Sequence, residues 1–296
     1  MAAVVMLAPL AAVQRRQNIA HFEHDLSNRR RLNADGIFVG AEAINLTADS
    51  SRAVLLLHGF GDTPQSVNPL ATALHAAGWN VRAPLMPGHG RALSEYAKAT
   101  HRDWIGQATS TYDELSAQHE TVVVCGISMG AALTVLLTVS RPKIPAIALL
   151  APYLSMSAAM QVKTIIARLF QFVFPYRANA GSESSIHDPV ARAATLGMGV
   201  VTGHLLNELR IVANMAEQML PSVRIPTLYL QSREDNRIPQ STAIAEFARI
   251  GSQLKEQRWL AGCGHIITVD YCKDEVASQV IRWFANTLPK KLVSNV

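Results

Sequence analysis

A serine lies between two glycines in the stretch Gly-Ile-Ser-Met-Gly at residues 126–130. A run of β-branched residues at 120–127 precedes it, and a helical pattern that opens with small residues follows it. Glycines on both sides of Ser128 allow a sharp strand-to-helix turn, which exposes the serine hydroxyl at the carboxyl end of the strand. An ordinary Gly-Ser turn needs neither flanking element, so the pattern predicts that Ser128 is a nucleophile.

A serine hydroxyl is a weak nucleophile at neutral pH, and it requires a base that is itself oriented by a carboxylate. His265 lies in the last loop, after a predicted strand near 257–260, and Asp235 follows the strand predicted at 226–231. All three side chains therefore come just after predicted strands, where open α/β sheets bind their ligands. This order predicts a Ser128–His265–Asp235 triad.

Two other acids compete with Asp235 for the orienting role. Glu234 is its direct neighbour, but Asp235 is better placed in the loop that leads to Pro239, where the next helix begins. Asp270 follows His265 closely, and we expect it to cap the region before the last helix.

The stretch His58-Gly59-Phe60-Gly61-Asp62 comes directly after the first clear strand pattern, at 52–58. Acyl transfer develops negative charge on the carbonyl oxygen, which two oriented donors must stabilise. We assign these donors to the backbone N–H groups of Phe60 and Met129. We expect His58 and His89 to order the turns in which they lie.

Short apolar runs alternate with longer helical patterns along the chain, which indicates a mainly parallel sheet with helices on both faces. This rhythm breaks between about 153 and 221, where helical patterns occur without a clear strand. An insertion of this length is usually functional, often as a lid. The predicted parts are an N-terminal extension at 1–34, a core at 35–152, a helical cap at 153–221 and the rest of the core at 222–296.

These motifs resemble those of the α/β-hydrolase superfamily, and within it the bacterial carboxylesterase and monoacylglycerol lipase group. The matching stretches are VLLLHGFGDTP (54–64), APLMPGHG (83–90), GISMG (126–130), SREDNRIP (232–239) and CGHIITVD (263–270). The resemblance implies an α/β-hydrolase fold and a serine esterase with a small helical cap over an apolar pocket. Gly61 stands where the family often has threonine, and about thirty leading residues match no part of the family.

The expected activity is hydrolysis of short- to medium-chain acyl esters or monoacylglycerols, without metal or organic cofactor. Apolar cap residues are expected to line or cover the acyl pocket, or simply to pack the cap onto the core: Ile166, Leu169, Phe170 and Phe174. Thioesterase, lysophospholipase, carbon–carbon hydrolase and acyltransferase activities use the same residues, because fold alone does not choose among them. A non-catalytic ligand-binding relative is the alternative from another class.

The composition bounds the remaining possibilities. Of 296 residues, 49% are hydrophobic and 17% charged, which excludes a disordered chain. The net charge of +5 is small. The basic residues gather only in doublets and in one triplet, Arg29-Arg30-Arg31, a distribution that does not suggest nucleic-acid binding. Three cysteines without a close pair argue against a disulfide framework and for a reducing compartment, hence a cytoplasmic location.

The first thirteen residues are apolar and are followed by Arg15 and Arg16. A signal peptide carries its positive charge before the apolar run, and a membrane-spanning helix needs about twenty apolar residues. We expect either a docked N-terminal helix or a loose extension, with a membrane-surface or export role as the alternative. The sequence leaves the oligomeric state open.

Overall fold

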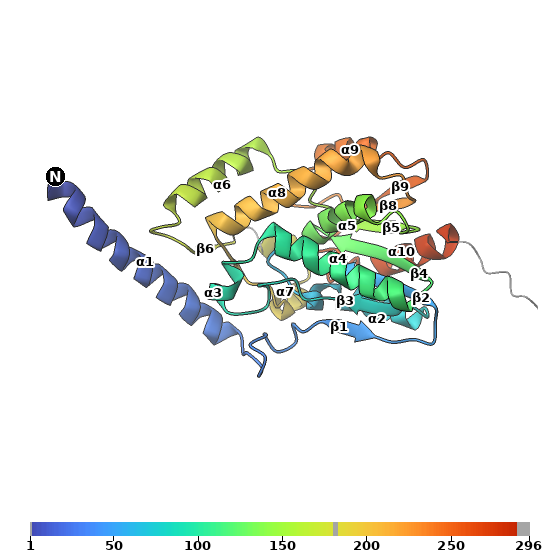
Figure 1. Ribbon diagram of the computed structural model, residues 1–296, viewed down its shortest axis with the longest axis horizontal. Helices are drawn as coiled ribbons and strands as arrows, with labels where there is room; N and C mark the ends of the chain where they lie inside the picture. The colour runs from blue at the N-terminus through green and yellow to red at the C-terminus, as the bar shows by residue number, and fades with distance from the viewer. Residues whose placement is uncertain (1, 180–182, 289–296) are drawn as a thin grey trace, which may run out of the picture.

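The computed structural model describes residues 2–179 and 183–288. A seven-stranded sheet forms the centre of the molecule, in the order β1-β3-β2-β4-β5-β8-β9 (Figure 1). The strands are β1 (Ile44–Leu46), β2 (Arg52–Leu57), β3 (Asn80–Ala83), β4 (Thr121–Ile127), β5 (Ile147–Leu150), β8 (Thr227–Ser232) and β9 (Lys255–Leu260). Among the described strands of this sheet, only β1 pairs antiparallel, so the predicted mainly parallel fold is confirmed.

Helices cover both faces of this sheet, which explains why its inner strands are almost continuously apolar. Five of the six residues of β2 are buried, for example. One face packs against α4 (His101–Gln118), α5 (Met129–Ser140) and α9 (Gln240–Arg249). The other packs against α2 (Asn68–Ala76) and α10 (Lys273–Thr287). The short elements η1 (Pro64–Val67) and α3 (Leu93–Tyr96) lie in the loops beside β2 and β3.

The N-terminus of α4 is closed by a capping box. The Thr100 side chain accepts a hydrogen bond from the Asp103 N–H, and the Asp103 carboxylate accepts one from the Thr100 N–H at 2.9 Å. Two backbone donors that the helix leaves unpaired are thereby satisfied.

The segment between β5 and β8 carries the helices that the sequence predicts for a cap. It consists of α6 (Ala158–Phe170), β6 (Arg177–Ala178), η2 (Glu183–Ser185), α7 (Pro189–Ala194), β7 (Val200–Val201), α8 (Gly203–Met219) and η3 (Leu220–Ser222). The expectation of no strand here is wrong, because β6 and β7 pair antiparallel. Strands of two residues are too short to leave an alternating pattern in the sequence.

The chain begins with a long helix, α1 (Ala2–Arg29), which extends along one side of the cap (Figure 1). The Asn18 side chain donates to the carbonyl oxygen of Tyr176 and accepts from its N–H, at 3.1 and 3.0 Å. Phe22 also contacts the Tyr176 ring. This segment is therefore a docked helix; Met1 lies outside the described residues. Among those described, no helix is long and apolar enough to cross a membrane.

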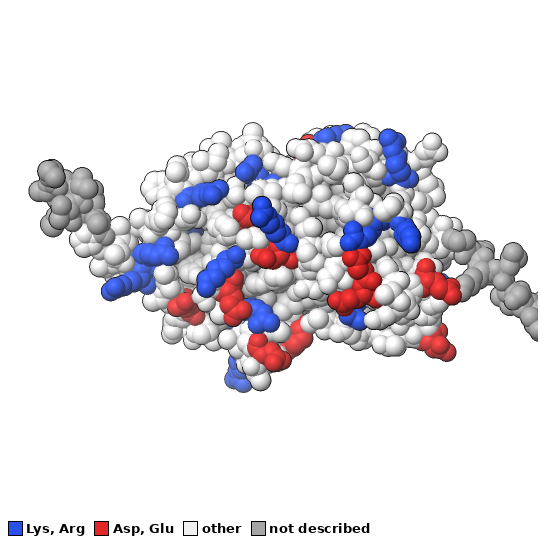
Figure 2. All heavy atoms as spheres, viewed as in Figure 1, with Lys and Arg blue, Asp and Glu red and all other residues white. Residues whose placement is uncertain are grey.

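Positive and negative side chains intermingle on the face shown in Figure 2, without a broad patch of either sign. The ion pairs of the surface are exposed to solvent, as in the pair of Arg141 with Asp113, whose nitrogen and oxygen lie 2.7 Å apart. Exposed pairs contribute little to stability.

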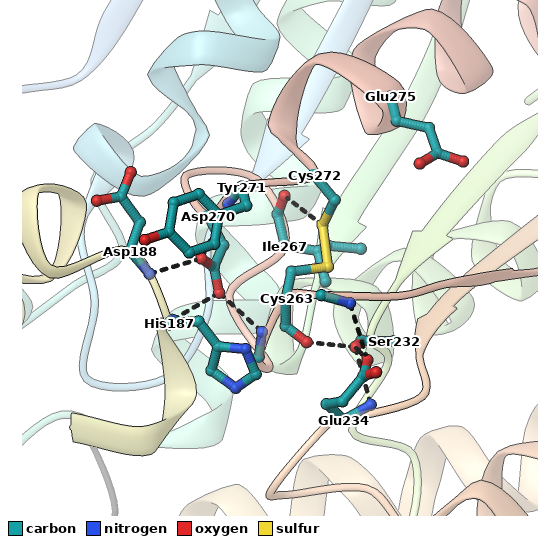
Figure 3. Close-up of a disulfide and its surroundings, with 12 residues drawn as sticks. His187, Asp188, Ser232, Glu234, Cys263, Ile267, Asp270, Tyr271, Cys272 and Glu275 are labelled. Carbon is teal, nitrogen blue, oxygen red and sulfur yellow. Dashed lines mark hydrogen bonds between the residues drawn. A yellow bond between two sulfur atoms is a disulfide. The ribbon is translucent and has the colours of Figure 1, made fainter.

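The sequence prediction about the cysteines is wrong. Cys263 and Cys272 form a disulfide that joins the loop after β9 to the start of α10 (Figure 3). Cys125 is a buried free thiol. The two bonded residues are nine positions apart, a spacing that belongs to no short motif, and only the path of the loop brings them together. The cysteines therefore no longer support a reducing compartment.

Candidate active site

Ser128 lies at the turn between β4 and α5, and its backbone has φ 55° and ψ −116°. Such a conformation is costly for a residue with a side chain and persists only where the surroundings enforce it. A Cβ on Gly126 would lie 2.2 Å from the Gly130 carbonyl oxygen, and one on Gly130 would lie 2.0 Å from that of Leu57. Both glycines are therefore required by close backbone packing around the turn.

The structure brings Ser128, His265 and Asp235 into one hydrogen-bonded series. His265 Nε2 lies 2.9 Å from Ser128 Oγ, and His265 Nδ1 lies 2.8 Å from Asp235 Oδ2. The Asp235 carboxylate is fully buried and the imidazole is 9% exposed. A buried carboxylate in this position fixes the tautomer and orientation of the imidazole, so that Nε2 faces the hydroxyl.

The Asp235 carboxylate is held by further donors besides the imidazole. Its Oδ1 accepts from the N–H groups of Arg237 and Ile238, at 2.7 and 3.0 Å, and its Oδ2 accepts from the Gln231 side chain at 2.7 Å. Burial acts to raise the pKa of Asp235, but His265 and the two backbone donors lower it below its ordinary value. The carboxylate is thus kept ionised beside the imidazole.

The two competing acids have other partners. Glu234 accepts a hydrogen bond from the Gly262 N–H at 3.2 Å. Asp270 accepts from the N–H groups of Gly264, His187, Asp188 and Tyr271, and so holds the His265 loop against the cap (Figure 3). Asp270 is therefore a structural carboxylate of this loop.

The Gly59–Phe60 peptide lies directly against the serine turn. A Cβ on Gly59 would come within 3.4 Å of Ser128 Cβ and 3.9 Å of its Oγ. Within the described residues, the N–H groups of Phe60 and Met129 donate no hydrogen bond to another backbone group. Both donors remain available beside the hydroxyl, as an oxyanion hole requires.

His58 and His89 lie behind the Phe60 loop and are fully buried. The Met86 N–H donates to His58 Nε2 at 3.0 Å, and His89 Nδ1 lies 3.2 Å from the Pro87 carbonyl oxygen. Burial lowers the pKa of His58 to about 4 and that of His89 to about 3, so both rings are neutral. Both order the turns around the site.

Ser128 and His265 open into a cavity of about 470 Å³. Its apolar lining includes Ile127, Met160, Val201, Leu206, Leu209, Ile238 and Ile266. No cluster of side chains that could hold a metal ion occurs in the described part of the chain.

The four cap residues predicted for the acyl pocket are not among the residues that line this cavity, so the expectation that they line it is wrong. Ile166, Leu169, Phe170 and Phe174 are between 42% and 70% exposed. The buried residues of α6 are Thr164 and Ala167. An amphipathic pattern predicts that one helix face is apolar, but it does not say whether that face points inward.

A family model described as "Serine aminopeptidase, S33" matches residues 48–271. This range includes all three residues of the hydrogen-bonded series and both flanking glycines. The chain belongs to this family. The hydrolase therefore has the α/β-hydrolase fold that its motifs indicate.

The relatives of the hydrolase include lipolytic enzymes. It is 30% identical over 232 residues to a thermostable monoacylglycerol lipase of Bacillus sp. (strain H-257), covering 78% of this chain and 90% of that protein. It is 25% identical over 235 residues to a carboxylesterase of Bacillus subtilis (strain 168), a match that covers 77% of this chain and 90% of that protein. A solved structure from work on the metagenome-derived lipolytic enzymes LipS and LipT matches with a TM-score of 0.76 and 27% identity, covering 83% of this chain and 98% of that chain.

Sequence reasoning did not place Arg29 and Arg30 in the site. Both line the cavity together with Ser128 and His265, although Arg29 is the last residue of α1 and Arg30 follows it. The arginine triplet is visible in the sequence, but no pattern there indicates that it reaches the site. α1 also lies before the range that matches the family.

Proposed function

We propose that the hydrolase cleaves short- to medium-chain carboxylic esters or monoacylglycerols through an acyl-enzyme intermediate. The observation that carries the proposal is the hydrogen-bonded series Ser128–His265–Asp235 at a partly apolar cavity. The names of its relatives, a monoacylglycerol lipase and a carboxylesterase, favour the same substrate class.

In the proposed reaction, Ser128 Oγ attacks the ester carbonyl carbon while His265 Nε2 takes the hydroxyl proton. Asp235 stabilises the imidazolium that forms and does not itself take a proton. The carbonyl oxygen becomes an anion between the N–H groups of Phe60 and Met129. His265 then gives its proton to the leaving alcohol, which leaves an acyl group on Ser128.

Water completes the cycle. His265 removes a proton from a water molecule as it attacks the acyl-enzyme, and returns that proton to Ser128 as the acid is released. Both halves of the reaction use one base and one oxyanion hole, so this chain's own residues are sufficient for the chemistry.

An ester chain-length profile tests the substrate class. We expect purified protein to hydrolyse p-nitrophenyl esters and monoacylglycerols, and Ser128→Ala to lower kcat by about a million-fold. A Ser128→Ala variant that retains most of the activity would contradict the nucleophile assignment. Adding thioesters and alcohol acceptors to the same assay separates thioesterase and acyl-transfer activity, and a fluorophosphonate probe that does not label Ser128 would favour a non-catalytic relative.

We also propose that the enzyme contacts the lipid surface from which its substrates come. Large apolar side chains are exposed on the outer face of α6 and in the turn after it: Val162, Ile165, Ile166, Leu169, Phe170, Phe172 and Phe174. Lys163 and Arg168 lie on the same helix, so an apolar face is bordered by positive charge. A surface of this kind favours the interface of an anionic bilayer.

Vesicle flotation tests this contact. We expect binding to vesicles of phosphatidylcholine and phosphatidylglycerol, and its loss in a Leu169→Asp/Phe172→Asp variant. Ile244→Asp is the matched control, because Ile244 is similarly exposed but lies on α9. Equal flotation of all three proteins would contradict the proposal.

A further inference from the structure

The end of α1 delivers positive charge to the active-site cavity. Arg29 and Arg30 line the same cavity as Ser128 and His265. The guanidinium of Arg29 also borders Gly199, where an added Cβ would lie 3.3 Å from Nη1. Both arginines lie before the residues that match the family, 48–271.

Among the described residues, Arg30 is held by carbonyl oxygens and by no carboxylate. Its Nη2 donates to the Thr195 carbonyl oxygen at 2.6 Å, and its Nη1 donates to that of Arg29 at 3.1 Å. Its Nε is buried and has no partner among the described residues. A guanidinium has five N–H donors, and carbonyl oxygens do not neutralise its charge. Arg30 therefore keeps both charge and donor capacity for a ligand.

Arg29 is paired, but only weakly. Its Nη2 lies 2.7 Å from Asp25 Oδ2, one turn back on α1, and both side chains are well exposed at 39% and 47%. Such a pair contributes little, so a stronger acceptor can replace it. Burial lowers the pKa of Arg30, and the charge of the neighbouring Arg29 lowers it further. A bound anion would offset both positive charges.

The other charged side chains that line the cavity are one arginine and one carboxylate. Arg237 also lines it, and Asp62 is the only acidic side chain among its described lining residues. Arg29 is paired with Asp25 and Arg237 lies close to Asp235, whereas Arg30 is paired with no described carboxylate. Beside the apolar lining, this charge makes a site for a molecule with an acyl chain and an anionic group. Guanidinium groups bind phosphate and carboxylate by paired, charge-assisted hydrogen bonds.

We propose that Arg29 and Arg30 form an anion subsite of the active site, and that the enzyme prefers esters that carry a phosphate or carboxylate away from the scissile bond. An acyl glycerol phosphate has this chemistry. The inference rests on the proposed ester hydrolysis and adds a substrate class to it. It also gives α1 a function in substrate selection beyond docking to the cap.

The alternative is that the arginines only fasten α1 to the loop at Thr195. A matched pair of substrates separates the two roles: 1-octanoylglycerol and 1-octanoylglycerol 3-phosphate, which differ only in the anionic group. The measured quantity is kcat/KM for each in the wild type and in an Arg29→Gln/Arg30→Gln variant. Arg15→Gln is the control, because Arg15 fastens α1 to the carbonyl oxygens of Gln171 and Phe172 but lies outside the cavity.

We expect the wild type to prefer the phosphate ester, and the double variant to lose about ten-fold or more of kcat/KM for that ester alone. Raising the ionic strength should increase KM for the phosphate ester and not for the neutral one. Arg15→Gln should leave the ratio of the two substrates unchanged. If the double variant does not fold, the exposed Arg29→Gln change alone should still lower the ratio.

Two results overturn the inference and leave the proposed function intact. One is a wild type that cleaves the neutral ester and shows no preference for the phosphate ester. The other is an unchanged substrate ratio in folded Arg29→Gln/Arg30→Gln. If instead the wild type cleaves neither ester and Ser128 is not labelled by a fluorophosphonate, the proposed ester hydrolysis itself fails.

Discussion

The disulfide between Cys263 and Cys272 closes the short loop that carries His265, and its removal has a calculable effect. Cross-linking two residues nine positions apart removes loop-closure entropy from the unfolded chain. The chain-entropy relation gives about 2.6 kcal/mol for a loop of this length at 25 °C. With an unfolding entropy of about 2.1 cal/mol/K per residue, the midpoint of thermal unfolding should fall by about 4 °C.

Catalysis should be affected much less than stability. The loop is also held by Asp270, which accepts hydrogen bonds from Gly264 within the loop and from His187 and Asp188 in the cap. In addition, the Ser232 hydroxyl donates to the Cys263 carbonyl oxygen. These contacts do not depend on the sulfur–sulfur bond, so we expect kcat at 25 °C to stay within about ten-fold while thermal inactivation becomes faster.

The assay compares the oxidised and reduced wild type, because their side chains are otherwise identical. Thiol titration of the denatured protein should find one thiol before reduction, that of Cys125, and three after it. A Cys263→Ala/Cys272→Ala variant should unfold near the reduced midpoint and not respond to reductant. Cys125→Ala is the control that should keep the full response.

Three thiols in the unreduced protein would refute the pairing. A midpoint that does not move on complete reduction, in a protein shown to contain the bond, would refute the entropy argument.

Three further changes probe the carboxylates and the serine turn. Asp235→Asn should lower kcat by about 10⁴-fold with little change in fold, measured with the best ester; near wild-type activity would contradict its orienting role. Gly130→Ala should destabilise by about 3 kcal/mol in denaturant unfolding, since its Cβ would meet the Leu57 carbonyl oxygen, whereas Gly106→Ala, with no atom within 4 Å, should not destabilise. Burial raises the pKa of Glu246 from 4.5 to about 7, so the folded state holds that proton more tightly and stability falls as pH rises between these values. Glu246→Gln should remove this fall, and an unchanged pH profile of the unfolding midpoint would contradict it.

Local geometry explains what the sequence alone could predict. The glycines around Ser128 indicate a tight turn because only short-range contacts are involved, and the structure shows the Cβ clashes that exclude other residues. The mainly parallel sheet follows from buried apolar runs that alternate with helical patterns. In a parallel sheet the strand ends lie at one edge, which is why Asp235 and His265 could be expected near Ser128 before any contact was known.

Tertiary packing decided the rest. Periodicity marks an apolar face on α6, but the direction of that face depends on where the whole cap rests, and the structure exposes Leu169. The cysteines at 263 and 272 meet because the loop between them folds back, which their spacing does not encode. Arg30 reaches the cavity because a helix at the start of the chain docks beside residues more than a hundred positions away. The free energy of such long-range contacts depends on surfaces that form only when the chain has folded. A local sequence pattern therefore does not predict them.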